Sequence, residues 1–289
     1  MGYGGAPTLG VRPCPSFAGG SVRHMADVQL APTPAGDLAY VRRGEGPPLL
    51  LVMGVAGHHL MWSEPFVAAL AEHFDVVAFD NRGIGQSFRA EPGFTLDDLA
   101  GDAAAVMDHV GWSAAHVLGI SMGGAIAQVL ALAHPERVQS LTLGCTWPDP
   151  EGAWAPGVMK LAEAAGAGDA LVAAKLMFEA NISPAGAAVE GAFEQFCADA
   201  AAVKVPGPVV MEQMRAATAH DVAARLGSLD VPTLVVHGTV DDVVSVEAGK
   251  RLASLVPGAR LELLEGVGHL FFREQPERSA ALVVRNAGL

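Results

Sequence analysis

A serine flanked by glycines is the first candidate for chemistry in this chain. Residues 119–123 read Gly-Ile-Ser-Met-Gly and lie between an apolar run and a helix-like stretch. A sharp turn from strand to helix strains the backbone at its centre, and flanking glycines avoid clashes there. The hydroxyl of Ser121 would lie exposed at the start of the helix, where the helix dipole favours a developing negative charge. Ser121 is therefore the candidate nucleophile.

A serine hydroxyl is a weak nucleophile near neutral pH, so a neighbouring imidazole must accept its proton. The chain has 10 histidines. His269 follows the glycine-rich residues 266–268, directly after the last apolar run, so a loop would present its ring at a strand end, where Ser121 also lies. His237 lies inside an apolar run and His134 precedes a proline, so packing or solvation explains them better. His269 is the candidate general base.

A carboxylate that orients this histidine should follow a strand and lie between the serine and the histidine in the sequence. Asp241 meets both conditions, because it comes shortly after the apolar run Thr233–His237. Asp242 is adjacent, and Asp149 follows the preceding apolar run. The residues alone leave all three as candidates for the acid.

Apolar runs of strand length alternate with helix-like stretches along most of the chain. Runs without polar alternation are typical of strands buried on both faces, as in a parallel sheet covered by helices. A hairpin is expected over residues 27–44, and helices over 96–110 and 122–133. The further predicted strands are Leu49–Met53, Val76–Phe79, His116–Gly119, Ser140–Gly144, Thr233–His237 and Leu261–Leu264. This order predicts an α/β protein with a mostly parallel sheet flanked by helices.

One long segment after the sixth strand, counting both strands of the hairpin, breaks this alternation. Residues 147–229 contain an alanine-rich helical pattern and no strong strand pattern. We expect them to form a helical cap over the carboxyl edge of the sheet, where ligands of α/β proteins bind. Residues 26–146 and 230–289 would then form the core. Residues 1–25, rich in glycine and proline, are expected to be a loose extension, with Met25 as a candidate start.

Together these motifs resemble those of the α/β-hydrolase superfamily, from about Leu30 to Ala287. Residues 80–87 resemble the structural D-x-R-G-x-G-x-S turn that follows the family's fourth strand. The resemblance implies that Ser121 is the nucleophile and His269 the base. The family places its acid three residues after the glycine that ends the strand, which selects Asp241. The resemblance thus implies a catalytic triad on an α/β-hydrolase fold.

The resemblance also implies an oxyanion hole made of two backbone N–H groups. Met122, which follows the nucleophile, would supply one of them. Residues 53–57, Met-Gly-Val-Ala-Gly, stand where the family has a His-Gly-x loop, and Val55 would supply the other. Met53 replaces the usual histidine, which leaves the backbone donor in place. Arg82, in the turn of residues 80–87, is expected to tie loops together and to take no part in catalysis.

Aromatic residues of the cap and of the loops below it are candidates for the walls of a substrate pocket. Such walls commonly hold uncharged organic substrates. The candidates are His58, Trp62, Trp147, Trp154 and Phe178. Packing of the cap on itself would explain most of these residues equally well.

The composition excludes several classes of function. Only 18 Lys and Arg oppose 31 Asp and Glu, for a formal net charge of −13, so nucleic acid and anionic membranes would repel the protein. The 3 cysteines are far apart and form no CxxC pair, which indicates neither a disulfide framework nor a zinc site. No P-loop or G-x-G-x-x-G motif follows the first strand, so no cofactor and no metal are expected. A cytoplasmic protein is expected, and a homo-oligomer remains open.

The sequence therefore predicts a serine hydrolase that cleaves an ester or lactone of a small apolar molecule through an acyl-serine intermediate. A serine nucleophile argues against the epoxide hydrolase and dehalogenase branches of the superfamily, whose nucleophile is a carboxylate. Because a fold does not determine a reaction, three alternatives stay open. They are hydrolysis of a carbon–carbon bond, cofactor-free haloperoxidase or perhydrolase activity, and ligand binding by a receptor-like protein with a slow triad.

Overall fold

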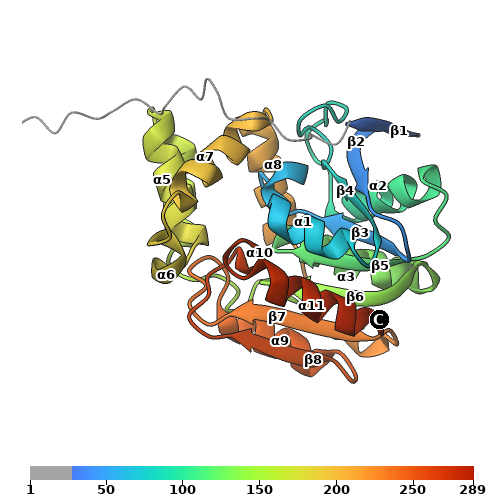
Figure 1. Ribbon diagram of the computed structural model, residues 1–289. Helices are drawn as coiled ribbons and strands as arrows, with labels where there is room; N and C mark the ends of the chain where they lie inside the picture. Colours follow the sequence, from blue (N-terminus) through green and yellow to red (C-terminus); the bar gives the residue numbers. More distant parts are fainter. Residues whose placement is uncertain (1–27) are drawn as a thin grey trace, which may run out of the picture.

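The computed structural model describes residues 28–289, and the extension expected over residues 1–25 lies outside them. An eight-stranded sheet forms the centre of the protein (Figure 1). Its strands are β1 (Gln29–Thr33), β2 (Gly36–Arg43), β3 (Pro48–Val52), β4 (Asp75–Phe79), β5 (Ala115–Ile120), β6 (Val138–Gly144), β7 (Thr233–Gly238) and β8 (Arg260–Leu264).

The strands lie in the order β1-β2-β4-β3-β5-β6-β7-β8. Strand β2 pairs antiparallel with β1 and with β4, and the remaining neighbours pair in parallel. Every residue of β4, β5 and β7 is buried, which explains why these strands read as continuous apolar runs. The predicted fold class, a mostly parallel α/β sheet flanked by helices, is confirmed.

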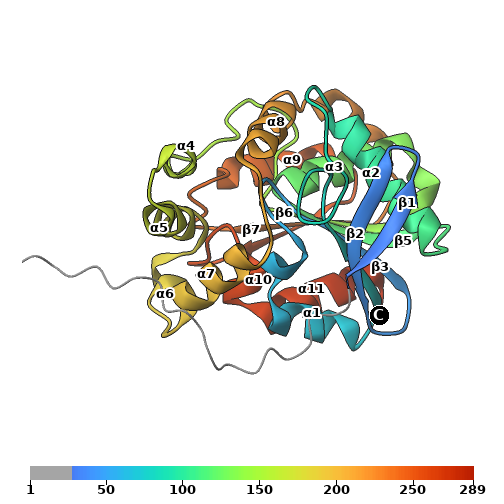
Figure 2. The same cartoon turned by 90° about the horizontal axis from the view of Figure 1, so that it is seen from above.

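Helices cover both faces of the sheet, as Figure 2 shows from above. On one face lie α1 (Glu64–Ala71), α10 (Phe271–Glu274) and α11 (Pro276–Ala287), and on the other lie α2 (Leu96–His109), α3 (Met122–Ala133) and α9 (Val246–Leu255). Short 3₁₀ helices connect these elements. The first, η1 (His59–Trp62), follows β3; η2 (Pro135–Arg137) follows α3; and η3 (Ala223–Ser228) precedes β7. No helix of residues 28–289 is long and apolar enough to cross a membrane.

Five helices occupy the stretch between β6 and β7. They are α4 (Val158–Gly166), α5 (Ala170–Asn181), α6 (Pro184–Ala187), α7 (Ala192–Ala202) and α8 (Gly207–Thr218), and we call them the inserted helices. In Figures 1 and 2, α5, α6 and α7 lie toward one end of the molecule, whereas α8 lies closer to the helices that cover the sheet. Trp154, just before α4, forms an isolated antiparallel bridge with Val244, so the segment is tied to the core where it begins.

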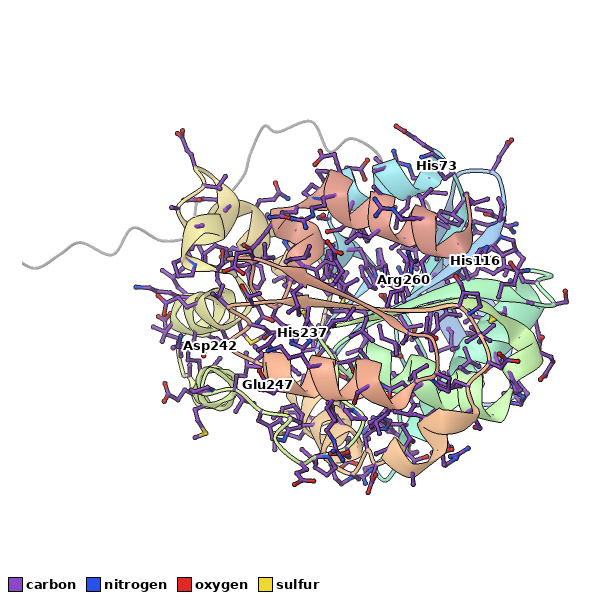
Figure 3. All side chains as sticks on the ribbon, turned by 90° about the horizontal axis from the view of Figure 1, so that it is seen from below. His73, His116, His237, Asp242, Glu247 and Arg260 are labelled. Carbon is purple, nitrogen blue, oxygen red and sulfur yellow. The ribbon has the colours of Figure 1, made fainter. Side chains whose placement is uncertain are left out.

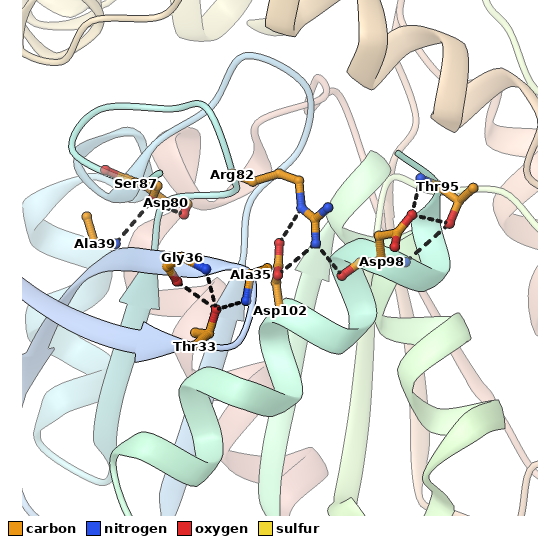
Figure 4. A network of polar contacts seen from close by, with 10 residues as sticks. All are labelled: Thr33, Ala35, Gly36, Ala39, Asp80, Arg82, Ser87, Thr95, Asp98 and Asp102. Carbon is orange, nitrogen blue, oxygen red and sulfur yellow. Dashed lines mark hydrogen bonds and ion pairs between the residues drawn. The ribbon is translucent and has the colours of Figure 1, made fainter. Parts of the chain in front are cut away.

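Arg82 links the turn after β4 to helix α2 (Figure 4). Its Nε and Nη2 donate to the two carboxylate oxygens of Asp102 at 2.7 and 2.9 Å, and Nη2 also donates to the carbonyl oxygen of Asp98. Burial raises the pKa of the Asp102 carboxyl, and the neighbouring guanidinium opposes that rise. The expectation that Arg82 ties loops together matches this geometry.

We expect Arg82→Leu to lower the free energy of unfolding by about 3 kcal/mol, because Asp102 would stay buried without its partner. Chemical denaturation would measure the loss. Arg278→Leu is the matched control, since Arg278 forms an exposed ion pair with Glu262 that should contribute about 1 kcal/mol or less. Equal losses in the two variants would contradict a structural role of Arg82 in this turn.

Candidate active site

Ser121 lies between β5 and α3 in a strained backbone conformation. Its φ of 56° and ψ of −124° lie outside the regions that ordinary residues favour. The strain follows from close packing on either side. A Cβ atom on Gly119 would lie 2.2 Å from the carbonyl oxygen of Gly123, and one on Gly123 would lie 2.0 Å from that of Val52. The Gly-Ile-Ser-Met-Gly segment therefore forms the sharp strand-to-helix turn expected from the sequence.

His269 and Asp241 form a buried hydrogen-bonded pair. The Nδ1 atom of His269 lies 2.8 Å from Oδ2 of Asp241, and both side chains are buried. Asp241 follows β7 in a short turn, where its Oδ1 accepts hydrogen bonds from the backbone N–H groups of Val243 and Val244 at 2.8 and 3.0 Å. These two bonds fix the carboxylate, which in turn fixes the orientation of the imidazole.

The charge of Asp241 is maintained by its partners. Burial would raise the pKa of this carboxyl, but the positive character and hydrogen bonds of His269 and His237 outweigh burial and hold the pKa below its usual range. An ionised Asp241 can accept the Nδ1 proton of His269 and stabilise an imidazolium, as the acid of a serine-hydrolase triad does.

His237 is a second imidazole beside the same carboxylate. Its Nε2 lies 3.3 Å from Oδ2 of Asp241 and 3.1 Å from the carbonyl oxygen of Val244. The sequence indicated a packed histidine, and the side chain is fully buried. Its contact with the carboxylate was not foreseen, because the turn that brings Asp241 back against the end of β7 leaves no sequence signal.

The other two candidate acids point elsewhere. Asp242 accepts hydrogen bonds from the backbone N–H of Gly157 and from Nζ of Lys160, both at 3.0 Å, and so holds the start of α4. Figure 3 shows it on the side of the core that faces the inserted helices. Asp149 forms an ion pair with Arg251 at 2.7 Å. Only Asp241 of the three bonds to His269 in the structure.

Asp241 also belongs to a group of side chains of the types that bind metals. Ligand atoms of Cys145, His237 and Asp241 lie within 4.8 Å of one another. Burial and the nearby carboxylate raise the pKa of the Cys145 thiol well above its usual value, so the thiol keeps its proton. Since metal binding requires a thiolate, and Asp241 is already hydrogen-bonded through both oxygens, these contacts explain the cluster without a metal.

Ser121 and His269 open onto one cavity of about 520 Å³. The inserted helices supply much of its wall through apolar side chains. The wall residues from α4, α5 and α8 include Val158, Leu161, Ala173, Met177, Val210, Met211, Met214 and Ala217. Apart from His269, none of the described residues that line it has an ionisable side chain. The cavity therefore suits an uncharged organic molecule.

Two of the five predicted pocket residues lie in this wall. Trp147 and Trp154 line the cavity, and their rings pack together with centroids 4.6 Å apart. Both lie in the stretch that leaves β6 and leads into α4, so they close the cavity on the side nearest the core.

The structure corrects the other three predictions. Trp62 is fully buried below the sheet edge, where it stacks on Phe66 and Phe272, and it is not part of the wall. Phe178 packs inside the inserted helices against the rings of Phe193 and Phe196. Trp62 contacts Phe272, and Phe178 contacts rings of α7, so the partners lie on other elements and spacing along one helix could not show which way these rings point.

His58 is the third correction. It is buried outside the cavity wall, and burial lowers its pKa to about 4, so the ring is neutral near pH 7. Methionines take much of the place expected for aromatic residues, and five of them line the cavity: Met53, Met61, Met177, Met211 and Met214. Met211 and Met214 lie three positions apart on α8, and methionines at such spacing look like ordinary core residues in a sequence, so their place in the wall was not predicted.

The predicted oxyanion donors lie close to the serine. A Cβ atom on Gly54 would be 3.0 Å from Cβ of Ser121 and 3.5 Å from its Oγ, so the loop of residues 53–57 passes directly beside the hydroxyl. Val55 lines the cavity together with Ser121. Met122 is the first residue of α3, where backbone N–H groups lack an intrahelical acceptor. Both N–H groups thus belong to segments that border the cavity at Ser121.

Comparison with known proteins agrees with this architecture. Residues 47–178 match the family model described as the alpha/beta hydrolase fold. Over 247 residues the chain is 32% identical to RutD of Azorhizobium caulinodans, a protein named for carbamate hydrolysis, and the match covers 83% of this chain and 91% of RutD. The chain belongs to the α/β-hydrolase family.

Solved structures of this family share the fold over most of the chain. The enol-lactonase from Burkholderia xenovorans LB400 has a TM-score of 0.78 and 26% identity, with 90% of this chain and 100% of that chain covered. The esterase RhEst1 from Rhodococcus sp. ECU1013 has a TM-score of 0.80 and 26% identity, with 90% and 98% covered. The predicted resemblance to α/β hydrolases is confirmed, and the chain is a hydrolase of this family.

Backbone strain at Ser121 gives a stability prediction. Ser121→Gly should have a free energy of unfolding about 1 kcal/mol higher than Ser121→Ala, because glycine relieves a strain of about 1–3 kcal/mol and gives up about 0.5–1 kcal/mol through its flexible unfolded state. Thermal or chemical unfolding of the two variants would measure the difference.

The exposed helical Ser254 is the matched control, since glycine should be the less stable choice there by about 0.5–1 kcal/mol. If the glycine variant were less stable than the alanine variant at position 121 as well as at position 254, Ser121 would not be strained.

Proposed function

We propose that this hydrolase cleaves an uncharged carboxylic ester or lactone through an acyl-serine intermediate, with Ser121, His269 and Asp241 as its catalytic triad. One observation carries the proposal. His269 lines the same cavity as the strained Ser121, and its imidazole is hydrogen-bonded to the buried, ionised Asp241. A nucleophile, a base and an orienting acid in this arrangement support acyl transfer.

The reaction begins when Oγ of Ser121 attacks the substrate carbonyl carbon and His269 takes the hydroxyl proton. The carbonyl oxygen becomes negative, and the backbone N–H groups of Val55 and Met122 stabilise it. When the tetrahedral intermediate collapses, His269 returns the proton to the leaving alcohol oxygen and the acyl group stays on Ser121. A water molecule, deprotonated by His269, then attacks the acyl carbon. The bond between that carbon and Oγ of Ser121 breaks, and His269 returns the proton to Oγ as the acid leaves. For a lactone the alcohol and the acid are one molecule.

The cavity favours a substrate with a sizeable apolar part. Its volume of about 520 Å³ lies well within the range of about 300–1,000 Å³ that is typical of small-molecule sites. A small unsubstituted carbamate would leave most of this space empty, and its polar groups would find few partners on methionine and valine walls. An anionic substrate would find no Arg or Lys among the described lining residues. Neutral esters and lactones therefore fit better.

We propose that residues 147–229 act as a cap on a core made of residues 26–146 and 230–289. The cap supplies most of the apolar cavity wall, whereas the core supplies the reacting groups. This division assigns substrate selection mainly to the inserted helices and chemistry to the ends of the sheet strands, a separation typical of α/β enzymes.

Hydrolysis of a chain-length series of p-nitrophenyl esters tests the proposed reaction. We expect the wild type to hydrolyse these esters, with a preference for medium apolar acyl chains over acetate, because the longer chains fill the cavity. Ser121→Ala should lose essentially all turnover. Ser254→Ala is the control for a serine outside the site. Turnover above a few per cent in Ser121→Ala would contradict the nucleophile, and no hydrolysis by wild type of any ester would contradict the reaction.

Separate asparagine variants test the acid. Asp241→Asn should lower kcat by about 10⁴, because an amide would favour the wrong tautomer of His269. Asp242→Asn keeps an oxygen that can accept from Gly157 and should lower kcat by less than about 10-fold, since Asp242 holds α4 and does not contact His269. Steady-state kinetics on the preferred ester would measure both, and a larger loss at Asp242 or at Asp149→Asn would show that Asp241 is not the acid.

A further inference from the structure

The loop of residues 54–57, which borders Ser121, forms a tight turn with an unfavourable backbone. The N–H of Gly57 donates to the carbonyl oxygen of Gly54 at 3.2 Å and closes the turn. Ala56, the third residue of the turn, has a φ of 59°, whereas Val55 does not have a positive φ. A positive φ at this position defines a type II turn, which prefers glycine there. Alanine in this place is strained, and a flip of the Val55–Ala56 peptide would relieve it.

A glutamine from the inserted helices holds this peptide in place. Oε1 of Gln213, on α8, accepts a hydrogen bond from the backbone N–H of Ala56 at 2.8 Å. The Gln213 side chain is fully buried, and the Ala56 N–H that it holds lies at the cavity wall. Neighbours on the same helix, Val210 and Ala217, line the cavity. The contact therefore connects the wall of the cavity to the turn beside the nucleophile.

We propose that Gln213 is a positioning residue for the oxyanion hole. It fixes the Val55–Ala56 peptide, and through it the neighbouring N–H of Val55, so that the oxyanion donor is aligned only while α8 is docked on the core. The inference rests on the proposed function. It assigns to the inserted helix a part in catalysis as well as in substrate selection.

Fold stability alone gives little reason for a glutamine at this position. Its Nε2 is buried and has no hydrogen-bond partner among the residues that the structure describes, which is unfavourable. A leucine would remove this unpaired amide but would leave the N–H of Ala56 unpaired. Because the two effects oppose each other, Gln213→Leu should fold with a stability near that of the wild type. The variant therefore separates a role in stability from a role in positioning.

Neighbouring loops of the site are held by the inserted helices through different contacts. The N–H of Leu270, next to His269, donates to the carbonyl oxygen of Asn181 at the end of α5 at 3.0 Å. Asp242, next to Asp241, holds the start of α4. These anchors do not involve α8. Loss of Gln213 should therefore disturb the oxyanion loop and leave the His269–Asp241 pair in place.

Kinetics of Gln213→Leu provide the first test, on the p-nitrophenyl ester that the wild type prefers. We expect kcat to fall by about 10- to 100-fold, while KM changes by less than about twofold. This decrease in kcat is no larger than the decrease expected when an oxyanion donor is removed altogether. An alkyl trifluoromethyl ketone, whose adduct with Ser121 places an oxyanion in the hole, should bind more weakly by a similar factor. Gln213→Glu keeps an acceptor for the Ala56 N–H and should retain more of the wild-type kcat than Gln213→Leu.

Gln195→Leu is the matched control, because Gln195 lies exposed on the inserted helix α7. It should behave as the wild type. A rise in KM with an unchanged kcat, or equal binding of the ketone by wild type and Gln213→Leu, would overturn the proposal. The proposal would also be overturned if Gln213→Glu and Gln213→Leu both folded normally and lost the same factor in kcat.

Hydrogen exchange supplies a readout that does not depend on hydrolysis. In Gln213→Leu the amide of Ala56 should exchange at least about 10-fold faster than in the wild type, whereas amides of the His269 loop should not change. Unchanged exchange at Ala56 would overturn the positioning role. If the wild type hydrolysed no ester, the proposed function would fail, and the exchange experiment would still decide whether Gln213 holds the loop.

Discussion

The close approach of β3, β5 and the start of α3 is the constraint on which the rest of the site depends. Gly123 packs so tightly on the carbonyl oxygen of Val52 that no Cβ atom would fit between them. This approach leaves Ser121 no ordinary backbone conformation, and its φ of 56° follows. The same contact brings the loop after β3 beside the hydroxyl. One packing constraint thus presents Ser121, the proposed nucleophile, and places the proposed oxyanion donors around it.

Asp241 plays the corresponding part on the other side of the cavity. Its two oxygens accept from two backbone N–H groups and contact two imidazoles, so the carboxylate has few remaining degrees of freedom. Buried carboxylates are costly unless such partners are present, and here the partners keep the group ionised. In the proposed mechanism, a fixed, charged Asp241 determines which nitrogen of His269 carries the proton and leaves the other nitrogen free to act on Ser121.

The sequence predicted the sheet better than the cavity wall. Strands such as β7 are buried on both faces, so their apolar runs were visible, and α3 ends before Pro135 as expected. The acid could not be chosen from residues alone, since Asp241 and Asp242 are adjacent. The turn after β7 directs Asp241 toward His269 and Asp242 toward α4. Trp62 turned out to pack on Phe272, a contact between distant segments that no local pattern encodes.

The inserted helices complete the surroundings of Ser121 and His269. The core alone would leave Ser121 and His269 at an open sheet edge, where water competes for every hydrogen bond. Met177 on α5 and Met211 and Met214 on α8 line the cavity with flexible, uncharged side chains. Because the same helices also bond to the loops that carry the site, a change in their sequence would alter both the space for the substrate and the alignment of the groups that act on it.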